Sequence, residues 1–403
     1  MSDAAPTVEF DPLDPALAID PYPAYRALRE SDPVHKSVLG VYLLTRHADV
    51  AQLLGDNETF EHQYLAQQQV RVGPQVEDEP YFAAFRHMVF VLDNPDHRRI
   101  RKLLHRAFTP RRVAELREHV VSIAHALIDE ADPGGTDFVH DLAFPLPMRV
   151  IGTLLGIPVS DHVTIGRHAT ALNPVLEFLP MSPEVLTEAN DAVGALTEYF
   201  TDLAQRRRTE PTDDLFSAMV HATEDGDVLT DAELIANAIL LYVAGHETTA
   251  GALSLALLAL HRSPDQLALL QRDRTLLPQA VTELLRYDTP GQGTARVLRT
   301  DATFGDVVVP AGNMALAYIG AANRDPAAFA APDRLDLTRT DLKTTTWGGG
   351  AHLCLGRSLA LVELEVALGT ILDRCPDLTL DSLDPPFRPN PLMRGLEHLP
   401  VRW

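Results

Sequence analysis

The chain has 403 residues, and its 34 lysines and arginines stand against 56 aspartates and glutamates, for a net charge of −22. This acidic balance argues against a nucleic-acid partner, and two cysteines argue against a disulfide framework. Residues 1–6 lack the basic and apolar segments of a signal peptide, so we expect a cytoplasmic protein without a membrane anchor.

Short strand and helix signals come first along the chain. Residues 41–44 predict a strand, and residues 47–54 predict a helix that stops near Gly55. Residues 57–92 have poor periodicity and several turn formers, which indicates a long irregular connection. Connections of that length inside a compact protein are often functional.

A strongly basic segment follows. Asp and Asn before Pro95 predict a helix that runs to residue 106 and places His97 and Arg101 on one face. Two interpretations of its basic residues stay open. They are a helix face balanced by acidic neighbours, or a docking patch for an acidic electron-transfer protein. The docking candidates are Arg98, Arg99, Lys102 and Arg106.

Residues 113–210 predict helices interrupted at prolines, and residues 231–262 predict the longest helix, roughly 48 Å at 1.5 Å per residue. Thr230 is its predicted N-cap, with Glu233 at capping-box spacing. The most apolar stretch, 234–260, contains Asn237, His246 and Glu247, which favours a buried helix over a membrane span.

The middle of this helix contains residues that suit a helix poorly. Gly245 and the pair Thr248 and Thr249 are weak choices for a helix interior. We expect locally broken backbone hydrogen bonds there, which would open a groove. Taken alone, the sequence favours a Thr248 hydroxyl bonded to its own helix and a Glu247 side chain in a salt bridge.

Further along, Glu283 and Arg286 lie three residues apart on one predicted helix face. Such pairs are usually superficial. Residues 304–310 and 314–319 predict two strands around a turn at 311–313.

The last motif is a glycine-rich loop, residues 347–356, that carries Cys354 and leads into a predicted helix from residue 357. A cysteine at a helix start favours a thiolate, because free amides and the helix dipole stabilise its charge. The glycines would let the backbone approach a flat, bulky group. The alternative is a buried structural cysteine after a turn.

The order Gly350-x-His352-x-Cys354-x-Gly356, shortly after Trp347, resembles the haem-binding loop of the cytochrome P450 superfamily. The family usually has Phe in place of Trp347, and a basic residue where Leu361 stands. The resemblance implies a mainly α fold with a smaller β-rich lobe. It also implies a single domain over residues 1–403, with about 20 N-terminal residues expected to be extended.

The resemblance also implies roles for particular residues. Cys354 would ligate the iron of haem b, and His97, Arg101 and Arg296 would bind the haem propionates. Further haem contacts are implied for Ala244, Gly245, Trp347, Gly348, Gly350, His352 and Gly356.

Ala244-Gly245-x-Glu247-Thr248 resembles the family's oxygen-activation motif, in which Thr248 and Glu247 would manage protons. Glu283 and Arg286 match a Glu-x-x-Arg pair with a structural role. The implied candidates for substrate contact are Phe85, Val89, Gln292, Leu392 and Met393.

The implied activity is a haem-thiolate monooxygenase that inserts one atom of O2 into a C–H bond or alkene of a small hydrophobic substrate. Its electrons would come from a ferredoxin and an NAD(P)H-dependent reductase, because the chain has no nucleotide-binding fingerprint of its own. Two alternatives stay open: a peroxide-driven or rearranging haem-thiolate enzyme, and a non-catalytic haem-binding or sensor protein.

Overall fold

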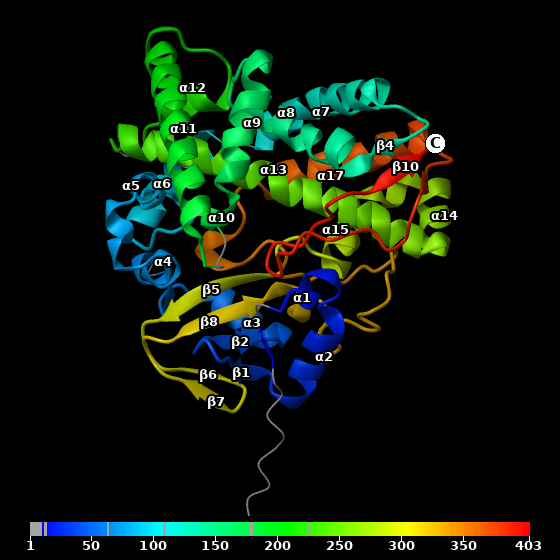
Figure 1. Cartoon of the computed structure of the whole chain (residues 1–403), viewed down its shortest axis with the longest axis horizontal. Helices are drawn as coiled ribbons and strands as arrows, with labels where there is room; N and C mark the ends of the chain where they lie inside the picture. The colour runs from blue at the N-terminus through cyan, green and yellow to red at the C-terminus, as the bar shows by residue number, and fades with distance from the viewer. Residues whose placement is uncertain (1–9, 12–13, 63, 108–109, 177–179, 225) are drawn as a thin grey trace, which may run out of the picture.

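The computed structural model describes residues 10–403 apart from 12–13, 63, 108–109, 177–179 and 225. Part of the N-terminal segment expected to be extended lies outside these residues. Its described end forms the short helix α1 (Ala16–Ile19). Helices fill the upper part of the molecule in Figure 1, and most strands gather in a smaller lobe below them. The predicted mainly α fold with a β-rich lobe is confirmed.

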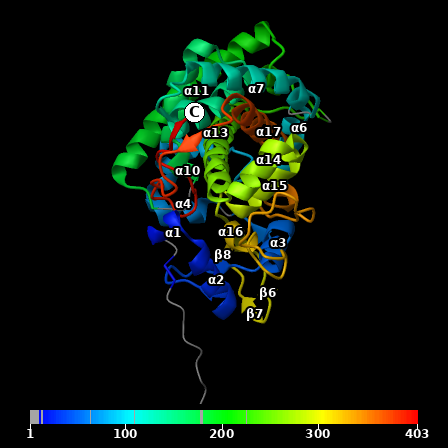
Figure 2. The same cartoon turned by 90° about the vertical axis from the view of Figure 1, so that its right-hand side faces the viewer.

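The longer helices make up the large lobe, and Figure 2 shows them packed around α13. The remaining helices in chain order are α2 (Tyr22–Ser31), α3 (His47–Gly55), α4 (Tyr64–Val72), α5 (Pro80–Phe85), α6 (Asp96–Ala107), α7 (Pro110–Glu130), α8 (Pro145–Leu154), α9 (His162–Ala171), α10 (Asn173–Leu176), α11 (Pro183–Thr209), α12 (Leu215–Val220), α13 (Asp231–Arg262), α14 (Pro264–Arg272), α15 (Leu277–Tyr287), α16 (Ile319–Ala322) and α17 (Arg357–Arg374). Short 3₁₀ or π turns are η1 (Pro74–Asp78), η2 (Phe138–Ala143), η3 (Val159–Asp161), η4 (Arg274–Leu276) and η5 (Gly350–His352).

The small lobe is built on a sheet with strand order β1-β2-β8-β5-β3. Strands β2 and β8 run parallel, whereas β5 is antiparallel to β8 with Arg296 opposite Ala315. A second sheet, β4-β10-β9, ties the C-terminus to the helical lobe. The strands are β1 (Val34–Lys36), β2 (Tyr42–Leu44), β3 (Phe60–Glu61), β4 (Thr136–Asp137), β5 (Gly293–Leu298), β6 (Ala302–Phe304), β7 (Val307–Val309), β8 (Met314–Tyr318), β9 (Thr379–Leu380) and β10 (Pro400–Arg402).

Helix α13 is the central element. It spans Asp231–Arg262 as predicted, and its capping box is present. The Thr230 amide donates to the Glu233 carboxylate at 2.9 Å, and the Thr230 hydroxyl accepts from the Glu233 amide at 3.3 Å. The helix is long and apolar enough to cross a membrane, but 78% of its most apolar window is buried in the protein. It is therefore a core helix, which the polar residues in its sequence predict.

Two predictions about secondary structure are wrong. Residues 57–92 are largely helical, with α4, η1 and α5, because prolines at the start of η1 and α5 nucleate short helices where periodicity is weak. The strand predicted at 304–310 divides into the hairpin β6–β7, since Gly305 adopts a φ of +55° that turns the chain.

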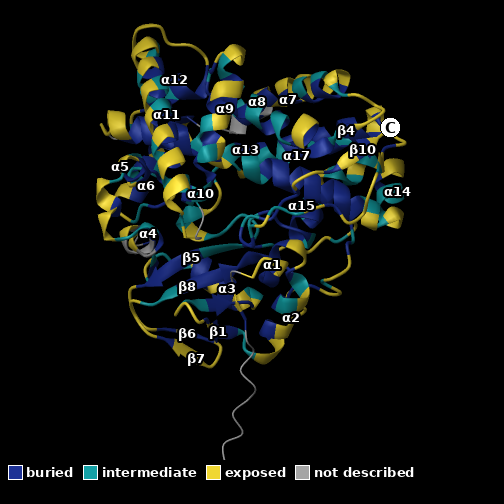
Figure 3. Ribbon diagram, viewed as in Figure 1, coloured by how far each residue is buried: buried dark blue, intermediate teal, exposed yellow. Residues whose placement is uncertain are grey.

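Figure 3 shows where the core lies: buried residues follow α15 and strands β5 and β8, while exposed residues face outward on α7, α11 and α14. One large apolar cluster joins the helices, and two smaller clusters fill the two sides of the small lobe's sheet. The turn at 290–293 and the C-terminal segment meet α13 between the lobes. A Cβ at Gly251 would lie 3.2 Å from the Arg394 carbonyl oxygen and 3.3 Å from Pro290.

Candidate functional site

The cysteine loop is a tight turn held by its own backbone. The Cys354 amide donates to the Trp347 carbonyl at 2.9 Å, and Gly348 and Gly350 have φ angles of +72° and +58°. A Cβ at Gly350 would lie 2.7 Å from the Leu54 carbonyl oxygen. Gly350 is therefore required by the close approach to the end of α3. By contrast, a Cβ at Gly356 would meet no atom of the described residues within 4 Å.

Cys354 is exposed, although the helix that follows it is largely buried. The surrounding atoms nevertheless desolvate its sulfur and raise the pKa of the thiol above its ordinary value. The backbone amides of Gly356 and Arg357 and the charge of Arg101 lower that pKa, but by less than burial raises it. Burial and the nearby amides thus act on the thiol in opposite directions, and a bound metal would stabilise its thiolate form.

The middle of α13 is less buried than the rest of the helix. Ala244 is exposed although most of α13 is buried, and Gly245 and Thr248 are partly exposed. The predicted break in the helix is absent, since α13 is continuous here, and the Thr248 and Thr249 hydroxyls donate to the carbonyls of Ala244 at 3.0 Å and Gly245 at 3.4 Å. Such back-bonding is compatible with a continuous helix.

The Glu247 carboxylate forms an ion pair with Arg388, which lies in the C-terminal segment. Arg388 is itself placed by backbone: its amide donates to the Gly395 carbonyl at 3.0 Å. The Glu247 side chain is only 11% exposed. The sequence alone favours a salt bridge for Glu247, and the structure contains one. No sequence pattern indicated that Arg388 would be the partner.

Cationic and imidazole groups gather beside the cysteine loop. The Arg101 guanidinium donates to the Leu353 carbonyl and, at 3.1 Å, to His105. Arg296 is buried, and its hydrogen bonds go to the Thr294 hydroxyl at 3.3 Å and the Ala295 carbonyl at 2.7 Å. Burial lowers the pKa of Arg296 to about 10, while Asp93 raises it. The positive charge of the buried Arg296 guanidinium is therefore only partly balanced by Asp93.

Three imidazoles lie in a row at this place, with their ring planes tilted to one another. The ring of His352 lies 3.9 Å from that of His97 and 4.2 Å from that of His62, between centroids. Burial lowers the pKa of His97 to about 4 and that of His352 to about 2, so both rings are neutral. Among the described residues, the Nε2 atom of His97 is buried without a hydrogen-bond partner.

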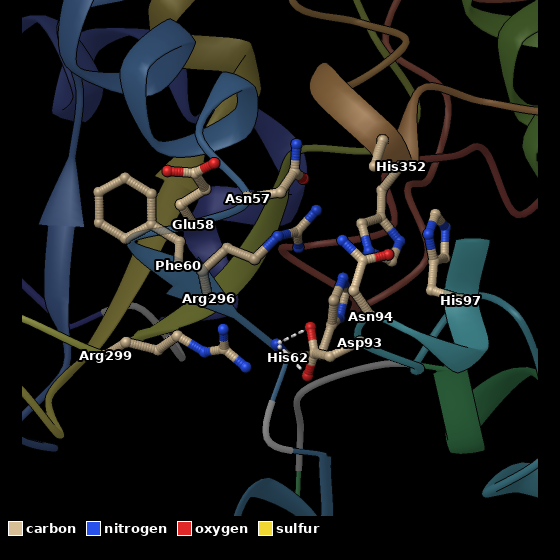
Figure 4. Close-up of a pocket in the computed structure, with 11 residues that line it drawn as sticks. Asn57, Glu58, Phe60, His62, Asp93, Asn94, His97, Arg296, Arg299 and His352 are labelled. Carbon is tan, nitrogen blue, oxygen red and sulfur yellow. Dashed lines mark hydrogen bonds between the residues drawn. The ribbon is translucent and has the colours of Figure 1, made fainter.

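A polar cavity of about 180 Å³ opens on these groups. Figure 4 shows the side chains of Arg296, His352 and His97 around it. Sequence reasoning missed His62, whose amide donates to the Asp93 carboxylate at 3.1 Å, because it lies in the segment of weak periodicity. The residues that line the cavity are Asn57, Glu58, Phe60, His62, Asp93, Asn94, His97, Arg296, Arg299, Ala351 and His352.

Glu283 and Arg286 form a fully buried ion pair, with Nε–Oε2 and Nη2–Oε1 distances of 2.6 and 2.8 Å. Arg286 also donates to the Asn323 carbonyl at 2.8 Å. The Asn323 side chain accepts from the Thr345 amide at 2.9 Å and donates to the Thr346 hydroxyl at 2.9 Å. A continuous hydrogen-bonded path thus runs from α15 to the residue before Trp347.

Most of the predicted substrate contacts are packed in the core. Phe85, Val89 and Leu392 are buried, and Leu392 belongs to the apolar cluster of the small lobe. Gln292 is fully buried and donates its amide to the Thr289 carbonyl at 2.6 Å, while among the described residues its Oε1 has no hydrogen-bond partner. Met393 is partly exposed and pairs with the 290–293 turn through a β-bridge to Gly291.

The basic face of α6 is partly neutralised. Arg99 pairs with Glu233 at the start of α13, and Arg106 pairs with Glu224. Arg98 and Lys102 are exposed, and within the described part of the chain Arg98 has no ion pair. The alternative of a face balanced by acidic neighbours is therefore correct for Arg99 and Arg106.

A mainly helical fold in which a glycine-rich loop presents a cysteine to a central helix, beside buried cations, is the architecture of a haem-thiolate enzyme. The comparisons with known proteins agree. The family model described as "Cytochrome P450" matches residues 168–396. The chain therefore belongs to the cytochrome P450 family and is a P450 monooxygenase.

Individual relatives cover nearly the whole chain. It is 41% identical over 376 residues to "Putative cytochrome P450 133B1" of Xylella fastidiosa, covering 93% of each chain. It is 39% identical over 392 residues to "Vitamin D(3) 25-hydroxylase" of Pseudonocardia autotrophica, covering 95% of this chain and 93% of the relative. The crystal structure of CalO2 superimposes with a TM-score of 0.91 at 32% identity, covering 98% of both chains.

The residues present fit a haem. An iron porphyrin needs one axial ligand, an apolar face and partners for two carboxylates. Cys354 offers an accessible sulfur, and no side chain occupies the space at Gly356. His97 has an unpartnered buried nitrogen among the described residues, and the buried Arg296 guanidinium bonds only neutral groups there. The His97 nitrogen and the Arg296 guanidinium can therefore both bind the carboxylates of a haem.

Proposed function

We propose that this P450 inserts one oxygen atom from O2 into a C–H bond or alkene of a small hydrophobic substrate, using haem b and electrons from a ferredoxin and its NAD(P)H-dependent reductase in the cytoplasm. The observation that carries the proposal is the exposed Cys354 in the glycine-rich loop, together with the exposure of Ala244 within the otherwise buried α13. The relative named vitamin D(3) 25-hydroxylase supports hydroxylation of a hydrophobic compound.

In this proposal Cys354 ligates the iron, Arg101 and Arg296 hold the propionates by charge and hydrogen bonding, and the neutral His97 ring holds them by hydrogen bonding. The haem, when bound, supplies dioxygen activation and oxygen insertion. The chain is one domain in this account. The remaining haem-lining residues are Ala244, Gly245, Trp347, Gly348, Gly350, His352 and Gly356.

Proton supply in this proposal belongs to Thr248 and Glu247. The Thr248 hydroxyl donates its hydrogen bond to the Ala244 carbonyl. Its oxygen lone pairs therefore remain free to accept a hydrogen bond from a water or a protonated ligand. The Glu247 carboxylate is held by its ion pair with Arg388. Glu247 must therefore exchange Arg388 for water before it carries protons to Thr248.

The direct test is turnover with oxygen-18. Hydrophobic compounds that shift the haem absorbance are incubated with the haem-loaded enzyme, ferredoxin, reductase and NAD(P)H under labelled O2. We expect one labelled oxygen atom in the product. Turnover only with hydrogen peroxide would establish the peroxide-driven alternative, and oxygen consumption without product from any bound compound would establish a non-catalytic haem protein.

Reduction by the ferredoxin is predicted to depend on Arg98. This exposed residue lies on α6, the helix whose Arg101 contacts the cysteine loop, and it belongs to a basic surface suited to an acidic partner. Arg98→Glu should slow haem reduction about two- to tenfold at low salt, and less at high salt. Stopped-flow absorbance measures the rate.

The matched control is Arg272→Glu, the same charge change at an exposed position on α14, which lies on the opposite side of the molecule in Figure 1. It should leave the rate unchanged. Arg99→Glu is a poor test, because it would also break the Glu233 ion pair at the start of α13. Equal rates for the parent and Arg98→Glu at low salt would remove Arg98 from the docking surface.

A further inference from the structure

Outside the cysteine loop, three side chains that can ligate a metal lie close together. Asp137, His140 and His398 each offer one ligand atom, and these atoms all lie within 4.8 Å of one another. Both histidines are exposed and Asp137 is partly exposed, so the cluster is open to solvent. The two imidazole rings lie 5.0 Å apart between centroids.

The scaffold around the cluster is regular and fixed. Strand β4 ends at Asp137, η2 carries His140, and His398 lies two residues before β10. Strands β4 and β10 pair with Pro400 opposite Asp137, and both lie beside the C-terminus in Figure 1. Ligands on paired strands and on the turn that follows them keep their spacing better than ligands on a free loop.

The Asp137 carboxylate is oriented by the backbone. Its Oδ1 accepts from the amides of Val139 at 3.0 Å and Leu399 at 3.1 Å. Its Oδ2 is thereby directed to the Nδ1 atom of His398, at 2.6 Å. Hydrogen bonds of this kind, which fix a ligand from behind, are what orient the ligands of natural metal sites.

We propose that Asp137, His140 and His398 bind a zinc ion that clips the C-terminal strand to the start of η2. The ion takes the place of the proton shared by His398 and Asp137, and that proton goes to solvent. Two imidazoles and one carboxylate suit zinc, with water as the fourth ligand, whereas magnesium and calcium prefer all-oxygen sites.

Binding requires the side chains to rotate. Zinc bonds of about 2.0–2.2 Å at tetrahedral angles place two ligand atoms roughly 3.4 Å apart, whereas the three atoms now lie within 4.8 Å of one another and Asp137 Oδ2 lies 2.6 Å from His398 Nδ1. Rotation of the exposed His140 or His398 side chain can close that difference, because neither ring is confined by packing. The site does not depend on the proposed oxygenase chemistry.

Calorimetric titration of the haem-loaded, full-length enzyme with zinc chloride tests the proposal. Haem loading occupies Cys354, so this thiol does not compete for zinc. We expect one zinc ion per chain. His140→Gln and His398→Gln should each weaken binding more than about tenfold, since loss of a direct ligand exceeds the 10–100-fold effects of outer contacts. The control His119→Gln, at an exposed position on α7, should bind as the parent does.

Thermal unfolding gives an independent readout. Zinc should raise the unfolding midpoint of the parent and of His119→Gln but not of the other two variants, because an ion that binds only the folded chain stabilises it. The haem spectrum of each variant verifies that it is folded. No binding of zinc up to about 1 mM, unchanged affinity in both ligand variants, or a loss confined to one of them would overturn the three-ligand site.

Discussion

Arg286→Met is expected to lose about 3–5 kcal/mol of folding free energy, the usual cost of removing one partner from a buried ion pair. Both side chains of the pair are fully buried. The change would leave Glu283 with Arg339, at 3.2 Å, as its remaining charged partner. It would also leave the carbonyls of Asn323 and Pro332 without the donor that now satisfies them at 2.8 and 2.9 Å.

The loss should be visible as haem-free or unfolded protein, because it is a large share of the 5–15 kcal/mol by which domains of ordinary size are stable. The path from Arg286 through Asn323 to Thr345 and Thr346 ends at the cysteine loop, so haem retention should fall together with stability. Urea unfolding followed by haem absorbance and by circular dichroism measures both.

Arg334→Met is the matched control. Arg334 lies in the same region of the chain and pairs with Asp336, but its side chain is 73% exposed. Exposed pairs contribute little, so this variant should change stability by less than about 1 kcal/mol. An Arg286→Met enzyme that holds haem and unfolds at the urea concentration of the parent would show that the buried pair is not a structural brace.

Thr248→Ala is expected to reduce the product formed per NAD(P)H consumed by more than about tenfold, with hydrogen peroxide released instead. Positioned proton transfer contributes roughly 10²–10⁴ in rate, and Thr248 presents the hydroxyl nearest the exposed Ala244 on α13. The structural cost should be small, because the lost hydrogen bond is to a carbonyl that remains in the helix.

The neighbouring Thr249→Ala provides the control. Thr249 is buried and bonds the Gly245 carbonyl in the same manner as Thr248 bonds that of Ala244. It should keep the parent ratio of product to NAD(P)H, because its hydroxyl does not face the interior space. Full coupling in Thr248→Ala, or an equal loss in both variants, would remove Thr248 from proton delivery.

Local sequence signals predicted the elements that carry the site. The limits of α13 follow from its apolar content. Its capping box follows from Thr230 and Glu233, which contact each other within the first helical turn. The start of α17 after Gly356 follows in the same way from the apolar periodicity beyond the glycine-rich loop. Short-range interactions decide these features, so one segment suffices to predict them.

Features set by distant segments could not be predicted. Glu247 has its partner 141 residues away in Arg388, in a segment without regular periodicity. His62 joins the imidazole row only because β3 pairs with β5. The raised pKa of Cys354 depends on burial by the whole fold, which outweighs the nearby amides. Each depends on tertiary packing, about which local spacing is uninformative.

The most direct test of the account is the absorbance of the haem-loaded protein after reduction and exposure to carbon monoxide. Ligation by Cys354 predicts the red-shifted Soret band typical of a thiolate ligand in the parent, and its loss in Cys354→Ser. A parent protein that binds haem and carbon monoxide without this band, or a Cys354→Ser variant that retains it, would contradict the assignment of Cys354 as the iron ligand.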